Sequence, residues 1–250
     1  MASSRSNEPQ TSVWLHERAQ PARKAAPAGR DRDRIVAAAI RLLDADGLAK
    51  FSMRRLAAEL GVSAMSVYWY VDNKDDLLEM ALDAVSGEVR LPDPGSGTPW
   101  QDDVRQLAVE FRRVLVAHPW ASRLIGEYLN VGPNSMELST TALRVMDNSG
   151  LPRPKAPGAL SAVYQFAYGY ATMEGRYVER CRDAGLTEDE FFRRITDCLV
   201  GRPGFEEREA IMRERASVGF EEGRERDFLF GLDCVIAGIE VMAERYGGHR

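Results

Sequence analysis

Residues 51–74, FSMRRLAAELGVSAMSVYWYVDNK, constrain the fold of this chain more than any other stretch. Ser52 can cap a first helix, Gly61 stands where a left-handed residue would end it, and Ser63 can cap a second helix. Small Ala57 lies in the middle of the apolar face of the first helix, so the two helices can cross closely. The pattern predicts a helix-turn-helix that is specified locally.

The second of these helices has a face that the helix pair does not bury. Met65 and Trp69 lie opposite Val67 on a helical wheel. A helical hairpin packed into a larger bundle would explain the apolar spacing equally well. It would not explain large exposed apolar and aromatic residues beside the cations Arg54 and Lys74. We therefore expect this face to bind DNA.

Residues 30–84 resemble the DNA-binding domain of the TetR family of transcriptional regulators. The parts follow in order without gaps: DRIVAAAIRLLDADG, then FSMRRLAAELGVS, then YWY followed by NKDDLL. The resemblance implies a three-helix domain with its helix-turn-helix at 52–71. The DNA contacts that it implies are Ser52, Met53, Arg54, Ala64, Met65, Ser66, Tyr68, Trp69, Tyr70 and Lys74.

The chemistry of these positions is uneven. Arg54 can donate two hydrogen bonds to guanine O6 and N7, which is the commonest specific contact to a base. Tyr68 and Lys74 are better suited to phosphates, where they would set the register without reading the sequence. Ala64 and Met65 can offer only apolar contact to thymine methyl groups. We therefore expect Arg54 to carry much of the discrimination.

The net charge of −5 argues against a protein that coats nucleic acid without sequence preference, because such a protein needs a large basic face. A sequence-specific binder needs only a local patch. Three arginines at the start of the first helix could supply it together with cations of the helix-turn-helix: Arg30, Arg32, Arg34, Arg54, Arg55 and Lys74. With 250 residues and 44% hydrophobic content, the chain is also long enough to bury a substantial core.

The sequence contains no stretch of eighteen apolar residues and no apolar signal-peptide core, so we expect a soluble, cytoplasmic protein. Its three cysteines, Cys181, Cys198 and Cys234, are widely separated and lack the C-x-x-C spacing of zinc or redox sites. We expect neither a cofactor nor a bound metal.

Pro, Gly and charge patterns divide the chain into three parts. Residues 1–28 lack periodicity and are interpreted as a disordered arm, which could reach into the minor groove or have no role. Residues 29–90 would form the DNA-binding domain, and the Pro and Gly loop at 91–100 would end it. Residues 91–250 would form an effector-binding and dimerisation domain.

Helical periodicity continues through the C-terminal part, and no segment alternates with period two for long enough to make a strand. The whole chain is therefore predicted to be all-α. The longest apolar pattern covers 159–184, and another covers 227–246. Thr187 and Glu190 have the spacing of a capping box. Residues 201–226 are rich in Arg and Glu and predict a solvated loop or a polar helix.

Three C-terminal runs, GPNSMELSTTALRVMDNSGL, YQFAYGYATME and DFLFGLDCVIAGIE, resemble the effector domain of the tetracycline-repressor subgroup. The resemblance implies a homodimer formed by the helices near 159–184 and 227–246, and hence a palindromic operator. It also implies that a small molecule in this domain swings the linking helix at 74–89. Any of the candidate pocket residues could instead be core: Trp100, Phe111, His118, Trp120, Asn130, Asn134, Met136, Tyr164, Gln165, Tyr168 and Met173.

The leading interpretation is a dimeric repressor that is released from operator DNA by a small hydrophobic molecule. In one alternative, Tyr68, Trp69 and Tyr70 form the hot spot of a protein-binding adaptor. In another, the chain is an all-α enzyme that uses the C-terminal cavity, although no Ser, His and Asp set has usable spacing. The sequence does not identify the effector, the operator, the regulated genes or the sign of regulation.

Overall fold

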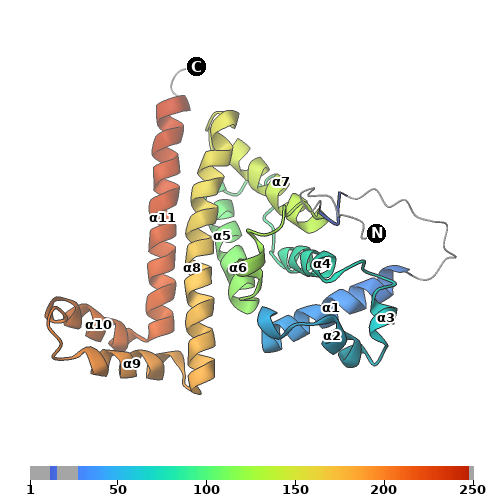
Figure 1. Ribbon diagram of the computed structural model, residues 1–250. Helices are drawn as coiled ribbons and strands as arrows, with labels where there is room; N and C mark the ends of the chain where they lie inside the picture. Colours follow the sequence, from blue (N-terminus) through green and yellow to red (C-terminus); the bar gives the residue numbers. More distant parts are fainter. Residues whose placement is uncertain (1–11, 16–27, 248–250) are drawn as a thin grey trace, which may run out of the picture. The chain divides into compact units, whose positions relative to one another are not determined.

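The computed structural model describes residues 12–15 and 28–247, and every regular element within them is a helix (Figure 1). The prediction of an all-α chain is confirmed. The chain divides into a first unit, residues 1–91 with 117–141, and a second unit, residues 92–116 with 142–250. The division after Leu91 lies in the predicted linker loop. Because residues 117–141 pack with the first unit, the assignment of all of 91–250 to one domain stays a prediction.

The first unit is built around α1, which contacts both α2 and α4. Its apolar core includes Leu43, Leu56 and Leu77, each no more than 1% exposed. None of the described helices combines the length and apolar character needed to cross a lipid bilayer. The elements of this unit are α1 (Ala28–Asp46), the 3-10 turn η1 (Leu48–Lys50), α2 (Met53–Leu60), α3 (Ala64–Val67), α4 (Lys74–Ser86), α6 (Ala121–Leu124) and the start of α7 (Pro133–Asp147).

The predicted helix caps of the helix-turn-helix are confirmed. The Ser52 side chain accepts a hydrogen bond from the Arg55 amide, and the Ser63 side chain accepts one from the Ser66 amide. Gly61 ends α2 with φ 69°, a left-handed conformation in which glycine meets no Cβ penalty. Both helix starts and the intervening turn are thus encoded by neighbouring residues.

Helix α3 is shorter than the sequence pattern predicts. Regular helix ends at Val67, and the chain continues in turns in which the Trp69 amide bonds to the Ser66 carbonyl and the Tyr70 amide to the Val67 carbonyl. Aromatic residues have low helix propensity because their side chains lose rotamers against the preceding turn. The run Tyr68 to Val71 therefore favours a tighter path, which still buries Val71.

Helix α7 is capped by a residue from another helix. Pro133 at its first position has no N–H, and Gly132 before it has no side chain that could act as a cap. Asp83 on α4 replaces that cap: its carboxylate accepts from the Asn134 amide at 3.3 Å and from the Ser135 amide at 2.9 Å. A Cβ on Gly132 would lie 2.3 Å from Cγ of Asp83, so glycine is required for this approach.

The second unit packs α5 against the pair formed by α8 and α11, which run side by side in opposite directions (Figure 1). Phe228 is fully buried and stacks on Phe166 with 5.5 Å between ring centroids. The polar stretch predicted at 201–226 forms a helix and the first turns of another. The elements are α5 (Trp100–Ala117), η2 (Arg153–Lys155), α8 (Ala156–Ala184), α9 (Glu188–Leu199), α10 (Glu206–Val218) and α11 (Phe220–Gly247).

A network of charged side chains, with Arg112 and Glu174 buried at its centre, links four helices of the second unit, α5, α8, α9 and α11. Arg112 and Glu174 are each 7% exposed, and Nε of Arg112 donates to Oε2 of Glu174 at 2.6 Å. The other Glu174 oxygen pairs with Arg224 at 3.1 Å. Arg112 also pairs with Glu225, and Arg224 with Glu188. Removing one partner would leave a buried charge uncompensated, so the network fixes how α5, α8 and α11 pair.

Gly132→Ala tests the close approach of Asp83. The added methyl group must displace a carboxylate that caps α7, so we expect the free energy of unfolding to fall by about 1–3 kcal/mol, as overpacking does elsewhere. Gly126→Ala is the matched control, because nothing lies within 4 Å of a Cβ at that position. Chemical denaturation measures both variants, and equal stability of the two would contradict the cap.

Candidate functional site

The face predicted to read DNA is exposed on the helix-turn-helix. Met65 is 70% exposed and Trp69 is 69% exposed, whereas Val67 between them is 1% exposed. Tyr68 is 42% exposed on the same segment. The predicted exposure of Met65 and Trp69 and burial of Val67 are therefore confirmed, although Trp69 lies in the turn after α3. The protein presents a large apolar and aromatic surface to solvent directly after a capped helix start, where a major groove could receive it.

The two arginines of α2 differ in what they contact. Arg55 is held within the unit: its guanidinium bonds to the Asp46 carboxylate at 2.5 Å and to the Lys50 carbonyl at 3.4 Å. Arg54 is exposed and has no hydrogen-bond or ion-pair partner among the described residues. Its five donors remain available for a guanine edge or a phosphate.

Three of the predicted DNA contacts are partly or wholly used inside the protein. The Tyr70 hydroxyl donates to Asp31 on α1 at 3.3 Å. Lys74 donates to the Phe51 carbonyl at 3.3 Å, and its ammonium lies 5.6 Å from the centroid of the Phe51 ring. Met53 is only 8% exposed and packs in the core, so little of its side chain reaches the surface where the contact is predicted. Ser52, Ala64 and Ser66 are half-buried at the two helix starts.

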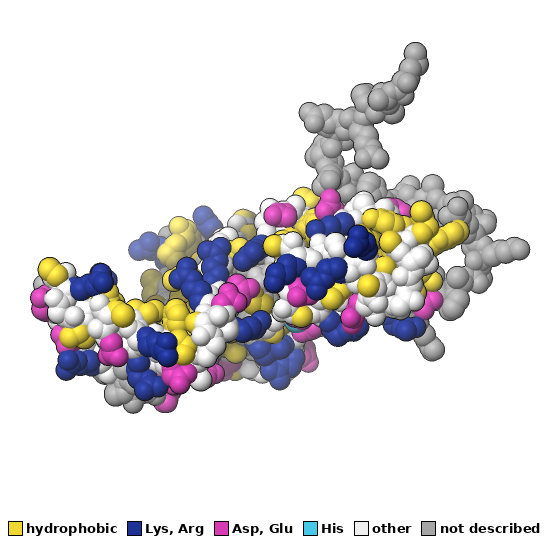
Figure 2. Space-filling view, turned by 60° about the horizontal axis from the view of Figure 1, so that its bottom comes forward, with side chains coloured by type: hydrophobic (Ala, Val, Ile, Leu, Met, Phe, Trp, Pro, Cys, Tyr) yellow, Lys and Arg dark blue, Asp and Glu magenta, His cyan; other side chains and the backbone are white. Residues whose placement is uncertain are grey.

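The surface turned forward in Figure 2 carries Lys and Arg side chains interspersed with acidic and apolar ones. Positive and negative side chains alternate across this face, so neither sign of charge covers all of it (Figure 2). This agrees with the net charge of −5 and with a local rather than general attraction for phosphates.

The candidate pocket residues fall into both units, and only some of them meet. In the second unit the ring centroids of Phe111 and Tyr164 are 5.0 Å apart, and those of Tyr164 and Tyr168 are 6.1 Å apart. Trp100 at the start of α5 is half-buried, Gln165 is exposed, and Met173 is 76% exposed. The aromatic trio of Phe111, Tyr164 and Tyr168 is thus the part of the predicted pocket in this unit whose members contact one another, and it lines neither of the two described cavities.

In the first unit, His118 and Trp120 are committed to a polar cluster. Asp44 on α1 bonds to Nδ1 of His118 at 2.8 Å and accepts from the indole of Trp120 at 2.7 Å, while Glu88 bonds to Nε2 of His118 at 3.1 Å. Burial disfavours the charged imidazolium, but the bonds and charges of the two carboxylates outweigh it and raise the pKa of His118. The two carboxylates thus favour the protonated imidazole, and the bond to Asp44 ties the segment of His118 to α1.

The remaining predicted pocket residues are also occupied or exposed. The Asn134 amide group donates to both the carboxylate and the backbone carbonyl of Asp83 at 3.1 Å. The Asn130 amide group donates to the Ile125 and Tyr128 carbonyls of its own loop. Met136 is 50% exposed. None of these three forms a wall of a described cavity.

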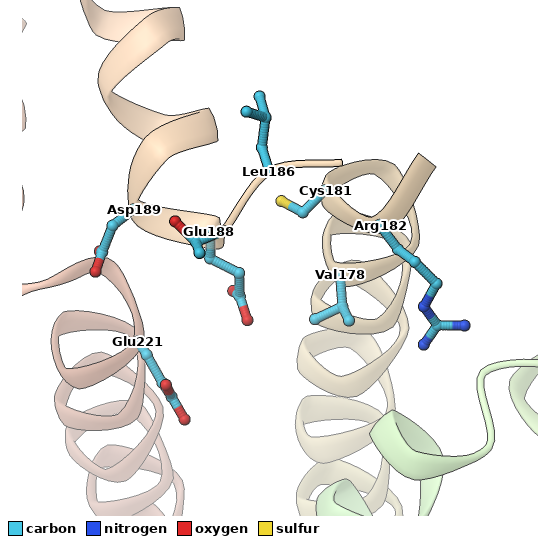
Figure 3. A pocket seen from close by; sticks show the side chains of 8 residues that line it. Val178, Cys181, Arg182, Leu186, Glu188, Asp189 and Glu221 are labelled. Carbon is cyan, nitrogen blue, oxygen red and sulfur yellow. The ribbon is translucent and has the colours of Figure 1, made fainter. Parts of the chain in front are cut away.

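Two cavities lie elsewhere in the second unit. One, of about 390 Å³, is open to solvent between the end of α8 and the starts of α9 and α11 (Figure 3). The other, of about 410 Å³, is mostly apolar. The first is lined by Val178, Cys181, Arg182, Leu186, Thr187, Glu188, Asp189 and Glu221, and the second by Ala184, Leu186, Phe191, Arg194, Ile195, Cys198, Leu199 and Arg202.

The sequence did not predict two buried carboxylates on α4 that bind other parts of the first unit. Glu79 and Asp83 are 5% and 4% exposed, although both are acidic. Glu79 accepts from the Ser12 hydroxyl and the Val13 amide, so residues 12–15 of the predicted disordered arm form a turn held by α4. The rest of that arm before Ala28 lies outside the described residues. The sequence signal for these contacts was the presence of two acidic residues, Glu79 and Asp83, four positions apart on an apolar helix.

Two family profiles cover most of the chain. The profile described as "Bacterial regulatory proteins, tetR family" matches residues 35–81, and that described as "Tetracyclin repressor-like, C-terminal domain" matches residues 91–243. The chain belongs to the TetR family. The exposed face that includes Arg54, Met65 and Trp69 thus lies within the residues that match the first of these profiles.

Individual relatives of this TetR-family chain are regulators as well. An HTH-type transcriptional regulator of Saccharopolyspora erythraea is 43% identical over 143 residues, which cover 57% of this chain and 60% of that relative. The transcriptional repressor DrrR1 of Streptomyces coeruleorubidus is 34% identical over 220 residues, 86% of this chain and 79% of the relative. The structure of Streptomyces coelicolor ActR with actinorhodin has a TM-score of 0.66 and 29% identity, and covers 85% of this chain and 97% of ActR.

Arg54→Ala tests the reading role that exposure and chemistry give to Arg54. We expect the discrimination between the best duplex and one with a single changed base pair to fall by about 1–3 kcal/mol, since a bidentate base contact is lost. Arg55→Ala is the matched control, because Arg55 is bound to Asp46, and should retain the selectivity. Band-shift titrations measure both, and full selectivity in Arg54→Ala would remove Arg54 from base reading.

Proposed function

We propose that this chain is a homodimeric transcriptional repressor that binds a palindromic operator and leaves it when a small hydrophobic molecule binds. The observation that carries the proposal is the exposed face formed by Arg54, Met65 and Trp69 on a helix-turn-helix whose other side is buried. The relatives are named as regulators and repressors, which supports a regulator over an enzyme or a protein-binding adaptor. We place it in the cytoplasm because its proposed partner is operator DNA.

The dimer is supported by the outer surface of α8 and α11. Large apolar side chains stand in solvent on these helices, with Met173 76% exposed, Phe230 72% and Val241 56%. Surfaces of this kind on two long adjacent helices favour burial against a second copy. A two-fold axis would then place two reading heads in successive major grooves, about 34–36 Å apart.

The small-molecule response is supported by the aromatic trio Phe111, Tyr164 and Tyr168 and by the relative ActR, whose structure contains actinorhodin. A ligand changes DNA affinity only if it binds the two states of the protein differently. The cap between Asp83 and α7 provides a route, because α7 continues past Thr141 into residues of the second unit. A ligand that displaced α7 would act on α4.

Selection of duplexes from a random library by the full chain tests this function. We expect enrichment of two inverted half-sites, two chains per duplex, and an affinity whose logarithm falls linearly with the logarithm of salt concentration. The slope reports the number of phosphates contacted. Enrichment of no sequence, as expected for an adaptor, or one chain on a single half-site, would contradict the proposal.

A further inference from the structure

Residues 12–15 form a turn that docks on α4, far from them in sequence. The Ser12 hydroxyl donates to Oε1 of Glu79, and the Val13 amide donates to Oε2 at 2.8 Å. The turn is closed by the Leu15 amide, which donates to the Ser12 carbonyl at 3.0 Å. Ser12 and Glu79 are each 5% exposed, so this contact is shielded from water.

The carboxylate of Glu79 depends on this turn. A buried carboxylate is costly unless donors reach it, and among the described residues the donors to Glu79 are those of Ser12 and Val13. Bonds to a charged acceptor are stronger than neutral ones, which helps to offset the entropy lost when the turn is ordered. Release of the turn would leave the Glu79 carboxylate on α4 without these two hydrogen-bond donors.

The same turn also reaches α1. The guanidinium of Arg32 lies 5.7 Å from the centroid of the Trp14 ring, in the range of a cation–π contact. The neighbouring residue, Asp31, accepts a hydrogen bond from the hydroxyl of Tyr70, which follows α3 in the helix-turn-helix. The turn therefore contacts both α4 and the first part of α1. That part of α1 in turn contacts Tyr70, which follows α3.

We propose that residues 12–15 are an intramolecular clip and that Trp14 is a positioning residue that holds Arg32 for a phosphate of the operator. This inference rests on the proposed function. The Arg32 side chain has many rotamers, and its contact with the Trp14 ring restricts these rotamers before DNA binds. Less side-chain entropy is then lost on binding. The bonds to Glu79 hold Trp14 in place, so the clip prepares both α1 and α4 for binding.

The test compares Trp14→Ala, Arg32→Ala and the double variant on the duplex selected by the full chain. We expect Trp14→Ala to weaken binding about tenfold and to reduce the salt slope by about 0.9, the value of one phosphate contact. The double variant should bind as Arg32→Ala does, because the effect of Trp14 acts through Arg32. Leu15→Ala, on the same turn but 55% exposed, is the matched control and should bind like the wild type.

Hydrogen exchange in the full chain without DNA measures the docking separately. We expect the Val13 amide to be protected, and Glu79→Gln, which keeps the side-chain shape but removes the charge, to accelerate its exchange about tenfold. An unprotected Val13 amide in the wild type, or Trp14→Ala with unchanged affinity and salt slope, would overturn the clip. If the full chain selects no duplex, the proposed function fails, and with it the role of the clip in binding. Protection of Val13 would still report docking.

Discussion

The carboxylate of Asp83 is the contact on which the first unit most depends. It lies on α4, is 4% exposed, and takes the place of a cap at the start of α7 by accepting from two backbone amides. Charge-assisted bonds to the end of a helix combine hydrogen bonding with the favourable interaction of an anion with the helix dipole. Gly132 supplies the space and Asn134 adds two side-chain bonds. Helix α4 is thereby fixed to α7 by direction-dependent contacts.

Other carboxylates extend the same principle. Glu79 lies one turn earlier on α4 and holds the N-terminal turn, and Glu88, just after α4, contacts His118. Apolar packing alone permits small sliding between helices, whereas buried ionic and polar contacts are satisfied in one arrangement only. The second unit uses buried charge too, through Arg112 and Glu174. A regulator needs discrete states of its linking helix, and such contacts can define them.

Local features of the fold could be predicted from sequence, and distant contacts could not. The caps at Ser52, Ser63 and the Thr187 capping box involve residues within three positions, so the sequence pattern contains all the partners. The exposure of Met65 and the burial of Val67 followed from helical periodicity, and Trp69 is exposed although regular helix ends before it. Asp83 and Asn134 are 51 positions apart, and nothing local pairs them. For this reason the sequence left Asn134 and His118 as candidates for either the pocket or the core, and the structure shows both in contact with acidic side chains.

Amide hydrogen exchange at Asn134 and Ser135 in Asp83→Asn tests most directly whether the carboxylate of α4 holds α7. The substitution keeps the shape of the side chain and removes its charge. The account predicts that both amides exchange at least about tenfold faster, since bonds to a charged group contribute roughly 1.5–3 kcal/mol. The Glu190 amide, capped by Thr187 in the second unit, should be unchanged and serves as the internal reference. Unchanged exchange at Asn134 and Ser135 would contradict the account.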